Sequence, residues 1–336
     1  MRRVTPPAHV DGMVPEGLPQ ESNRRGFYDV ETSLRHECWA CPDTPCINFP
    51  SRAVGETEHV VALPVDPDES VCPVDAIALP EFGSIPIITD ECVGCGACVR
   101  ACPIGAIRID SVSQKAVVEA PAGLVPEAAF DEKRKARSRS LRWASPASDL
   151  VSPPVRIRIA YGSSSHLSDQ QARKFARSAF RVDGLRSDLA VTGDNGPWPE
   201  AVAQSDDQLM IMEVTSGVDL LDPLRRLLVS HAHVYRRLSD EERARKRLSM
   251  GLISGGVPSR RTDSYRLMSD IWRYLGMRTS LLTTEAVMLL LSQPGKLKSW
   301  VQSSIDWDFP PVEQVGLGLR KLGFGADLAA SFMPEK

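Results

Sequence analysis

All eight cysteines of this 336-residue chain lie between positions 38 and 102, where they form two groups. The compact group has the spacing C-x2-C-x2-C-x3-C-P, at Cys92, Cys95, Cys98, Cys102 and Pro103. The open group consists of Cys38, Cys41 and Cys46, followed 26 positions later by Cys72 and Pro73. Such clustering of thiols predicts that this region of the chain folds around bound metal.

The compact group has the spacing that an iron–sulfur cube requires. Three thiolates at two-residue spacing bind three corners of one cube, whereas a cysteine just before a proline binds the other cluster. The spacing therefore predicts two [4Fe–4S] clusters with crossed ligands. The first cluster is predicted to bind Cys38, Cys41, Cys46 and Cys102, and the second to bind Cys92, Cys95, Cys98 and Cys72.

Zinc and disulfide bonds are the alternative uses of these thiols. A four-cysteine zinc site usually takes two C-x2-C pairs that are about a dozen or more residues apart, and the compact group does not have that pattern. Disulfides are typical of secreted proteins, and nothing in this sequence marks it as secreted. Iron–sulfur binding is the interpretation that fits both groups.

An internal repeat accompanies the cysteines. The segments Cys72–Leu79 and Cys102–Ile109 share a pattern of cysteine, proline and apolar residues, offset by 30 positions. With this repeat and the two motifs, residues 36–110 resemble a bacterial-type two-cluster ferredoxin. The resemblance implies an α+β ferredoxin-like fold, with a hairpin strand after each cluster, and a role in electron transfer. Gly94 and Gly96 fit it, because backbone without side chains can approach the inorganic sulfides.

Two features depart from small free ferredoxins. The C-x2-C-x4-C spacing of Cys38, Cys41 and Cys46 is closer to that of iron–sulfur subunits of larger reductases. In addition, an insertion of 25 residues at 47–71 separates Cys46 from Cys72, where the family usually has a short spacer. We expect this insertion to be a surface excursion that covers a cluster or docks a partner.

The rest of the chain divides by composition. Residues 1–35 are a polar tail, and residues 111–154 form a proline-containing linker with six basic residues between Lys133 and Arg142. No stretch approaches the roughly 18 apolar residues of a membrane span, and the N-terminus lacks the apolar region of a signal peptide. Oxygen-sensitive clusters without spare cysteines favour the cytoplasm.

The net charge of −3 conceals an asymmetry. Residues 1–130 contain 9 basic and 19 acidic residues, a balance of −10, whereas residues 131–336 contain 31 and 24, a balance of +7. An acidic ferredoxin half suits a basic redox partner protein. The basic half can meet nucleic acid, meet the acidic half of its own chain, or remain a solvated surface.

Local patterns predict a three-layer α/β domain over residues 155–336. Apolar and alternating runs predict strands at 155–161, 187–192, 209–215, 250–254 and 279–283. Helices are expected after the capping box at Ser168–Gln171, from Asp222, from about Asp263 to Gly276, and at 284–291. Residues 297–336 are expected to pack across the domain.

One fold that fits this order is the restriction-endonuclease-like core, named for its PD-(D/E)XK signature. Asp188 resembles the aspartate of that signature and Glu213 resembles the glutamate; such carboxylates converge on a Mg²⁺ ion that activates water. Thr215 occupies the position of the usual lysine, so the resemblance implies the fold more strongly than the activity. If this domain is an enzyme, we expect a Mg²⁺-dependent nuclease.

The competing fold is a doubly wound, flavodoxin- or Rossmann-like domain. The turn Tyr161–His166 lies before a helix, where a phosphate can bind, but it contains one glycine and no dinucleotide fingerprint. His231 and His233 face different directions on a helix and are interpreted as surface or packing residues. The sequence predicts a cytoplasmic iron–sulfur protein for electron transfer or redox sensing, in preference to an enzyme. A nucleic-acid-binding or nuclease-like protein is the alternative.

Overall fold

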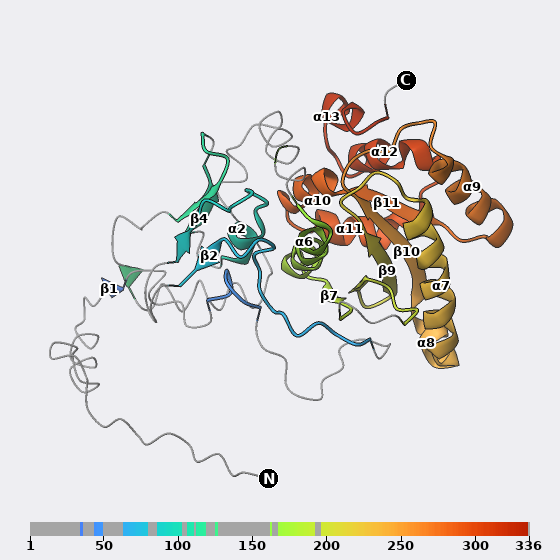
Figure 1. Ribbon diagram of the computed structural model, residues 1–336, viewed down its shortest axis with the longest axis horizontal. Helices are drawn as coiled ribbons and strands as arrows, with labels where there is room; N and C mark the ends of the chain where they lie inside the picture. Colours follow the sequence, from blue (N-terminus) through green and yellow to red (C-terminus); the bar gives the residue numbers. More distant parts are fainter. Residues whose placement is uncertain are drawn as a thin grey trace, which may run out of the picture.

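The chain folds into a small cysteine-rich region and a larger α/β region that lie side by side (Figure 1). The computed structural model describes residues 34–35, 44–49, 63–79, 86–102, 106–110, 112–118, 125–126, 162, 167–191 and 196–334. The predicted strand at 155–161 and most of the predicted tail and linker lie outside the described residues.

Among the residues that the structure describes, short antiparallel strand pairs and one helix form the cysteine-rich region. The strands pair as β2 (Ile77–Ala78) with β3 (Ile87–Ile88), β4 (Ile107–Ile109) with β5 (Ala116–Val118), and β1 (Leu34–Arg35) with β6 (Val125–Pro126). The start of β2 and the start of β4 are separated by the 30 positions of the sequence repeat. The hairpin strands that the ferredoxin resemblance implies are therefore present in both halves.

Helix α2 (Ala97–Ala101) carries Cys98 and begins after a glycine turn. Gly94 and Gly96 have φ angles of 65° and 82°, a left-handed conformation that residues with a Cβ rarely adopt. The two predicted glycines therefore have a conformational role beside the cysteines.

A five-stranded mixed sheet forms the centre of the α/β region. Its strands are β7 (Arg186–Leu189), β8 (Ala201–Gln204), β9 (Gln208–Val214), β10 (Arg247–Ser254) and β11 (Thr279–Thr283). They lie in consecutive order, with β8 antiparallel to both of its neighbours and β9, β10 and β11 mutually parallel. The described sheet therefore combines an antiparallel meander with two parallel crossovers.

Helices cover both faces of this sheet (Figure 1). The α-helices are α6 (Asp169–Val182), α7 (Leu221–Arg237), α8 (Asp240–Arg245), α9 (Asp263–Leu275), α10 (Thr284–Leu291), α11 (Lys296–Ser303), α12 (Gln314–Lys321) and α13 (Ala326–Ala330). Short 3₁₀ helices span Ser304–Asp306 and Pro311–Glu313. Both crossover helices, α7 and α9, lie together on one face, because right-handed crossovers that step in one direction place them there. Helix α6 packs with α10 and α11 on the other face.

Most of the predicted local signals are confirmed. Ser168 and Gln171 form the expected capping box at the start of α6. Helix α9 starts at Asp263 and ends at Gly276, which adopts the left-handed conformation that closes many helices. Strand β8 and helix α8 were not predicted, and neither were the helices α11, α12 and α13 near the end of the chain.

The general α/β prediction is confirmed, but neither of the two more specific fold assignments is supported. A doubly wound sheet reverses its strand order and is mostly parallel, so this alternative is wrong for the described sheet. The findings support an α/β region with a mixed sheet, but they do not support the restriction-endonuclease-like resemblance.

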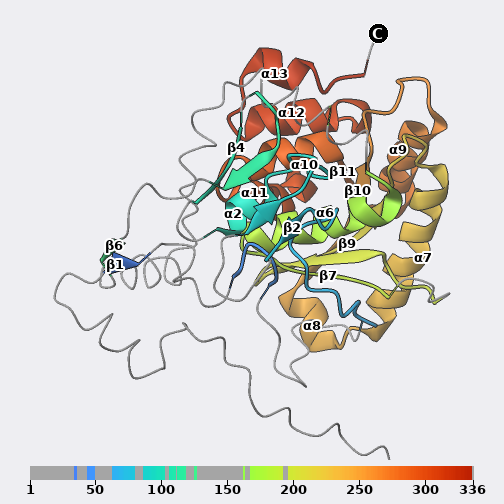
Figure 2. The ribbon, with the colours of Figure 1, turned by 60° about the vertical axis from the view of Figure 1, so that its left-hand side comes forward.

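The two regions of the molecule share one hydrophobic core. Val71, Ala97 and Ala101 from the cysteine-rich region join the buried residues of α6, β8 and β9 in a single cluster. Val71 and Ala97 are fully buried. Figure 2 shows α2 lying against α6, and the two helices are in contact. The cysteine-rich region therefore packs as a layer on α6.

The end of the insertion forms a docking segment, defined here as residues 63–71. Asp66 donates its backbone N–H to the carbonyl of Leu189, and Val191 donates to that of Pro64, at 2.9 and 2.8 Å. These bonds place the segment antiparallel to the chain at the end of β7. The expectation of a surface excursion is therefore wrong for this segment, which docks on the protein's own α/β region.

Within the described residues, no helix is both long enough and apolar enough to span a bilayer.

Candidate iron–sulfur site

Six of the eight predicted cysteine ligands lie among the described residues: Cys46, Cys72, Cys92, Cys95, Cys98 and Cys102. Cys38 and Cys41 lie outside the described residues. Cys46, Cys72, Cys98 and Cys102 are buried, whereas Cys92 and Cys95 are partly exposed. Four of the six described cysteines therefore lie in the interior of the protein.

The fold brings Cys72 to the compact motif. Burial raises the pKa of the Cys98 thiol well above its usual range, and the nearby thiols of Cys95, Cys72 and Cys92 raise it further. Burial also raises the pKa of Cys95, with Cys72 as its strongest thiol neighbour. These mutual effects require that the four sulfurs lie close together, although Cys72 is 20 positions before Cys92. Cys46 acts on Cys98 as well, so the two cysteine groups adjoin.

Backbone N–H groups point at several of the sulfurs. Ala76 donates to Cys72 Sγ and Ala106 donates to Cys102 Sγ, both over 3.2 Å. The two bonds are equivalent under the 30-residue repeat. Cys92 Sγ accepts from the backbone of Ala116, over 3.3 Å. Such bonds stabilise negative charge on a ligating sulfur and help to set the potential of an iron–sulfur cluster.

The residues present fit a [4Fe–4S] cluster. Four adjacent thiols, two of them buried, are unfavourable as bare thiolates, and bound iron would supply the compensating positive charge. Among the residues that the structure describes, no three His, Cys, Asp or Glu side chains meet closely enough to hold a single metal ion. The sulfurs around a cube bind different iron atoms and need not meet at one point.

Comparisons with known proteins agree with this arrangement. Residues 85–108, which contain the compact motif, match the 4Fe-4S binding domain family. The chain carries a ferredoxin-type iron–sulfur domain.

Three relatives illustrate the extent of the likeness. An uncharacterized ferredoxin of Methanocaldococcus jannaschii is 41% identical over 22% of this chain and 52% of its own length. The putative electron transport protein YsaA of Escherichia coli is 35% identical over 25% of this chain and 43% of its own. The formate dehydrogenase iron–sulfur subunit of Wolinella succinogenes is 31% identical over 26% and 37%. The chain spans about half or less of the length of these curated relatives.

Helix α6 holds the ferredoxin-type domain through the docking segment. Arg177, which is 1% exposed, donates to the backbone carbonyls of Asp68 and Ser70, the latter over 2.6 Å. Lys174 pairs with the carboxylate of Asp68 at 2.6 Å, and Arg181 pairs with Glu69. Some basic residues of the segment 131–336 thus pair with the acidic half of the same chain. This was one of the three alternatives predicted for the basic half.

A second contact joins α6 to helix α2. Arg100 lies on α2 between Cys98 and Cys102 and is 2% exposed. Its guanidinium is 3.7 Å from the carboxylate of Asp183, at the end of α6. Asp183 also accepts backbone N–H bonds from Gly295 and Lys298, at 2.7 and 2.9 Å. The backbone beside Cys98 and Cys102 is therefore anchored through α6 to α11.

The structure does not bring Asp188 and Glu213 together. Asp188 is fully buried on β7 and pairs with Arg181, whereas Glu213 on β9 pairs with Arg226 at 2.8 Å. The register places Asp188 opposite Val202, two strands and two residues away from Glu213. Strand spacing makes that separation about 12 Å between Cα atoms. Convergence on one Mg²⁺ ion is not supported, and the comparisons give no support to a nucleic-acid partner.

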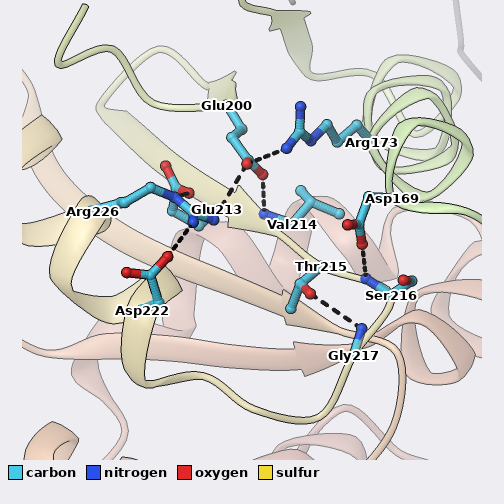
Figure 3. Close-up of polar contacts among 10 residues, drawn as sticks. All are labelled: Asp169, Arg173, Glu200, Glu213, Val214, Thr215, Ser216, Gly217, Asp222 and Arg226. Atoms are coloured by element: carbon cyan, nitrogen blue, oxygen red, sulfur yellow. Dashed lines mark hydrogen bonds and ion pairs between the residues drawn. The ribbon is translucent and has the colours of Figure 1, made fainter. Parts of the chain in front are cut away.

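The carboxylate beside Glu213 is instead Glu200, which the sequence patterns did not single out (Figure 3). Glu200 accepts the backbone N–H of Val214 at 2.9 Å and pairs with Arg173, and Arg226 lies 3.4 Å from it. Burial and then the neighbouring Glu200 carboxylate raise the pKa of Glu213 to about 7. In the sequence, Glu200 stood out only as a glutamate directly before a strand that was itself not predicted.

The remaining predicted sites are the turn Tyr161–His166 and the two histidines His231 and His233. Of the turn Tyr161–His166, only Gly162 is described. The His231 ring stacks on Tyr235 and the His233 ring meets Trp198 edge-on, with centroids 6.3 and 4.7 Å apart. The two histidines therefore pack against different aromatic rings, as predicted for residues that are not a metal pair.

Proposed function

We propose that this protein transfers single electrons through two [4Fe–4S] clusters with crossed ligands. The first cluster is assigned to Cys38, Cys41, Cys46 and Cys102, and the second to Cys92, Cys95, Cys98 and Cys72. The observation that carries the proposal is the proximity of Cys72 to the three cysteines of the compact motif.

When bound, each cluster supplies a centre that accepts one electron and returns it. The chain's own groups then bind the cluster and limit its exposure to water. Buried sulfurs exclude solvent, and N–H groups such as those of Ala76 and Ala106 stabilise the charge on the ligands. The contact between the two cysteine groups favours electron exchange within the domain.

The proposal includes a partner protein that exchanges electrons with the clusters. Relatives over the same region of the sequence include an electron transport protein and a formate dehydrogenase subunit, by their names. We therefore favour electron delivery to or from a partner enzyme over redox sensing. The α/β region would hold the electron-transferring domain and is not required to be catalytic.

A reductive titration tests this function. The full chain, purified without oxygen, is titrated with dithionite while its visible absorption is followed. We expect a brown protein that bleaches on uptake of about two electrons per chain, one for each cluster, and regains colour with a one-electron oxidant. A cluster-loaded protein that takes up no electrons reversibly would contradict electron transfer.

A further inference from the structure

Two buried cations lie where the cysteine-rich region meets helix α6: one is on α6 itself, and the other pairs with a residue at its end. Arg177 on α6 is 1% exposed, and Arg100 on α2 is 2% exposed. Reduction adds one negative charge to a cluster, and a nearby cation stabilises that charge, more so where water is excluded. Buried cations at this position therefore favour the reduced state.

Arg177 contacts the backbone just before a predicted cluster ligand. Its guanidinium donates to the carbonyl oxygens of Asp68 and Ser70, and Ser70 precedes Cys72 by two positions. Its Nε is buried without a hydrogen-bond partner. The two acceptors are uncharged carbonyls, so these contacts do not neutralise Arg177. The nearby carboxylates of Asp68 and Glu69 pair with Lys174 and Arg181.

Arg100 has a buried carboxylate as its direct neighbour. The carboxylate of Asp183 lies 3.7 Å from Arg100, and both side chains are almost fully buried. Two backbone N–H groups hold Asp183 in this position. Asp183 therefore offsets some of the field of Arg100 at the sulfurs of Cys98 and Cys102.

We propose that helix α6 sets the reduction potential of the clusters, with Arg177 raising it and Asp183 lowering it. The α/β region is then an electrostatic component of the electron-transferring domain and not only its support. This inference rests on the proposed function, because it needs clusters bound by the eight cysteines.

Midpoint potentials of full-chain variants test the inference. The wild type and each variant are first assayed for iron and sulfide, then titrated with dithionite at pH 8 while paramagnetic resonance follows the reduced clusters. We expect Arg177→Gln to lower the potential and Asp183→Asn to raise it, with Arg177→Lys close to wild type. Shifts of the midpoint potential in opposite directions distinguish a charge effect from loosened packing, because loosened packing would shift the potential of both variants in one direction.

Arg173→Gln is the matched control. Arg173 lies on the same helix as Arg177, but its partner is the carboxylate of Glu200 and not a residue of the docking segment. Removing this cation should leave the potential unchanged. If Arg177→Gln does not fold, the rise in Asp183→Asn decides the inference by itself.

The failures of the two proposals differ. A wild type without iron and sulfide contradicts the proposed function. The role of α6 is contradicted if the clusters are loaded but their midpoint potentials do not change in Asp183→Asn and Arg177→Gln. It is also contradicted if both potentials shift in the same direction.

Discussion

Arg177 donates a hydrogen bond of 2.6 Å to the carbonyl of Ser70, a residue 107 positions earlier in the chain. The bond joins the middle of helix α6 to the segment that leads into Cys72. The same segment pairs with the chain at the end of β7 and contributes Val71 to the shared core. The end of the insertion that separates two predicted cluster ligands therefore also links the two regions of the molecule.

Truncation of Arg177 should loosen this link. In Arg177→Ala the buried carbonyls of Asp68 and Ser70 lose their donor, and we expect a loss of stability on the order of 3 kcal/mol. Denaturant unfolding of the full chain measures it. The exposed Arg225→Ala on α7 is the control and should change stability by less than about 0.5 kcal/mol. Equal effects of the two substitutions would contradict the structural role of Arg177.

The crossed ligation predicts which cluster each cysteine supports. We expect Cys72→Ser to damage the cluster of Cys92, Cys95 and Cys98, because the fold places Cys72 beside them. Cys102→Ser should damage the other cluster, although Cys102 belongs by sequence to the compact motif. Paramagnetic resonance of the reduced proteins separates the two centres. Loss of the compact motif's own cluster in Cys102→Ser, and of the other cluster in Cys72→Ser, would show that the ligands are not crossed.

Several elements could be predicted because their signals are local. Ser168 and Gln171 begin α6 within four positions, and Gly276 ends α9 by its own left-handed backbone. Strand β8 was missed because Ala201–Gln204 is buried at every position and shows no alternation. The cysteine spacing indicated the candidate site directly, since three of the four predicted ligands of each cluster are close along the chain.

The docking of the two regions could not be predicted in the same way. Asp68, Glu69 and Ser70 are polar and resemble solvated loop residues, and Arg177 resembles a surface cation on an amphipathic helix. Their pairing is visible only in three dimensions, because more than 100 positions separate the partners. The expected Asp188–Glu213 pair shows the same limit, since the strand register separates these residues and places Glu200 beside Glu213.

The Glu213 carboxyl should make stability depend on pH. Its pKa is raised from 4.5 to about 7 in the folded protein, so between these values the folded state keeps a proton that the unfolded state loses. Stability from this group is fully present below pH 4.5 and falls as pH rises to 7, by at most about 3 kcal/mol.

The variant Glu213→Gln should remove this dependence. We expect the difference between the unfolding midpoints of the variant and the wild type to increase in the variant's favour between pH 5.5 and pH 8. The exposed Asp222→Asn, which also removes a carboxylate partner of Arg226, is the control and should not show that rise. A parallel pH dependence in wild type and Glu213→Gln would refute the buried proton.

Two adjacent glycines after β10 should differ sharply in their tolerance of alanine. A Cβ on Gly255 would lie 1.8 Å from the carbonyl oxygen of Ser216, so the turns after β9 and β10 would have to separate. We expect Gly255→Ala to cost roughly 3 kcal/mol. In Gly256→Ala the nearest atom, Cγ1 of Val218, would be 3.6 Å away, and little change is expected. Thermal unfolding compares the two, and equal midpoints would contradict the close approach of these turns.

The measurement that tests the account most directly is the iron and acid-labile sulfide content of the full chain, purified without oxygen. Two [4Fe–4S] clusters predict about eight iron atoms and about eight sulfide ions per chain. Stoichiometric zinc without sulfide would contradict the account.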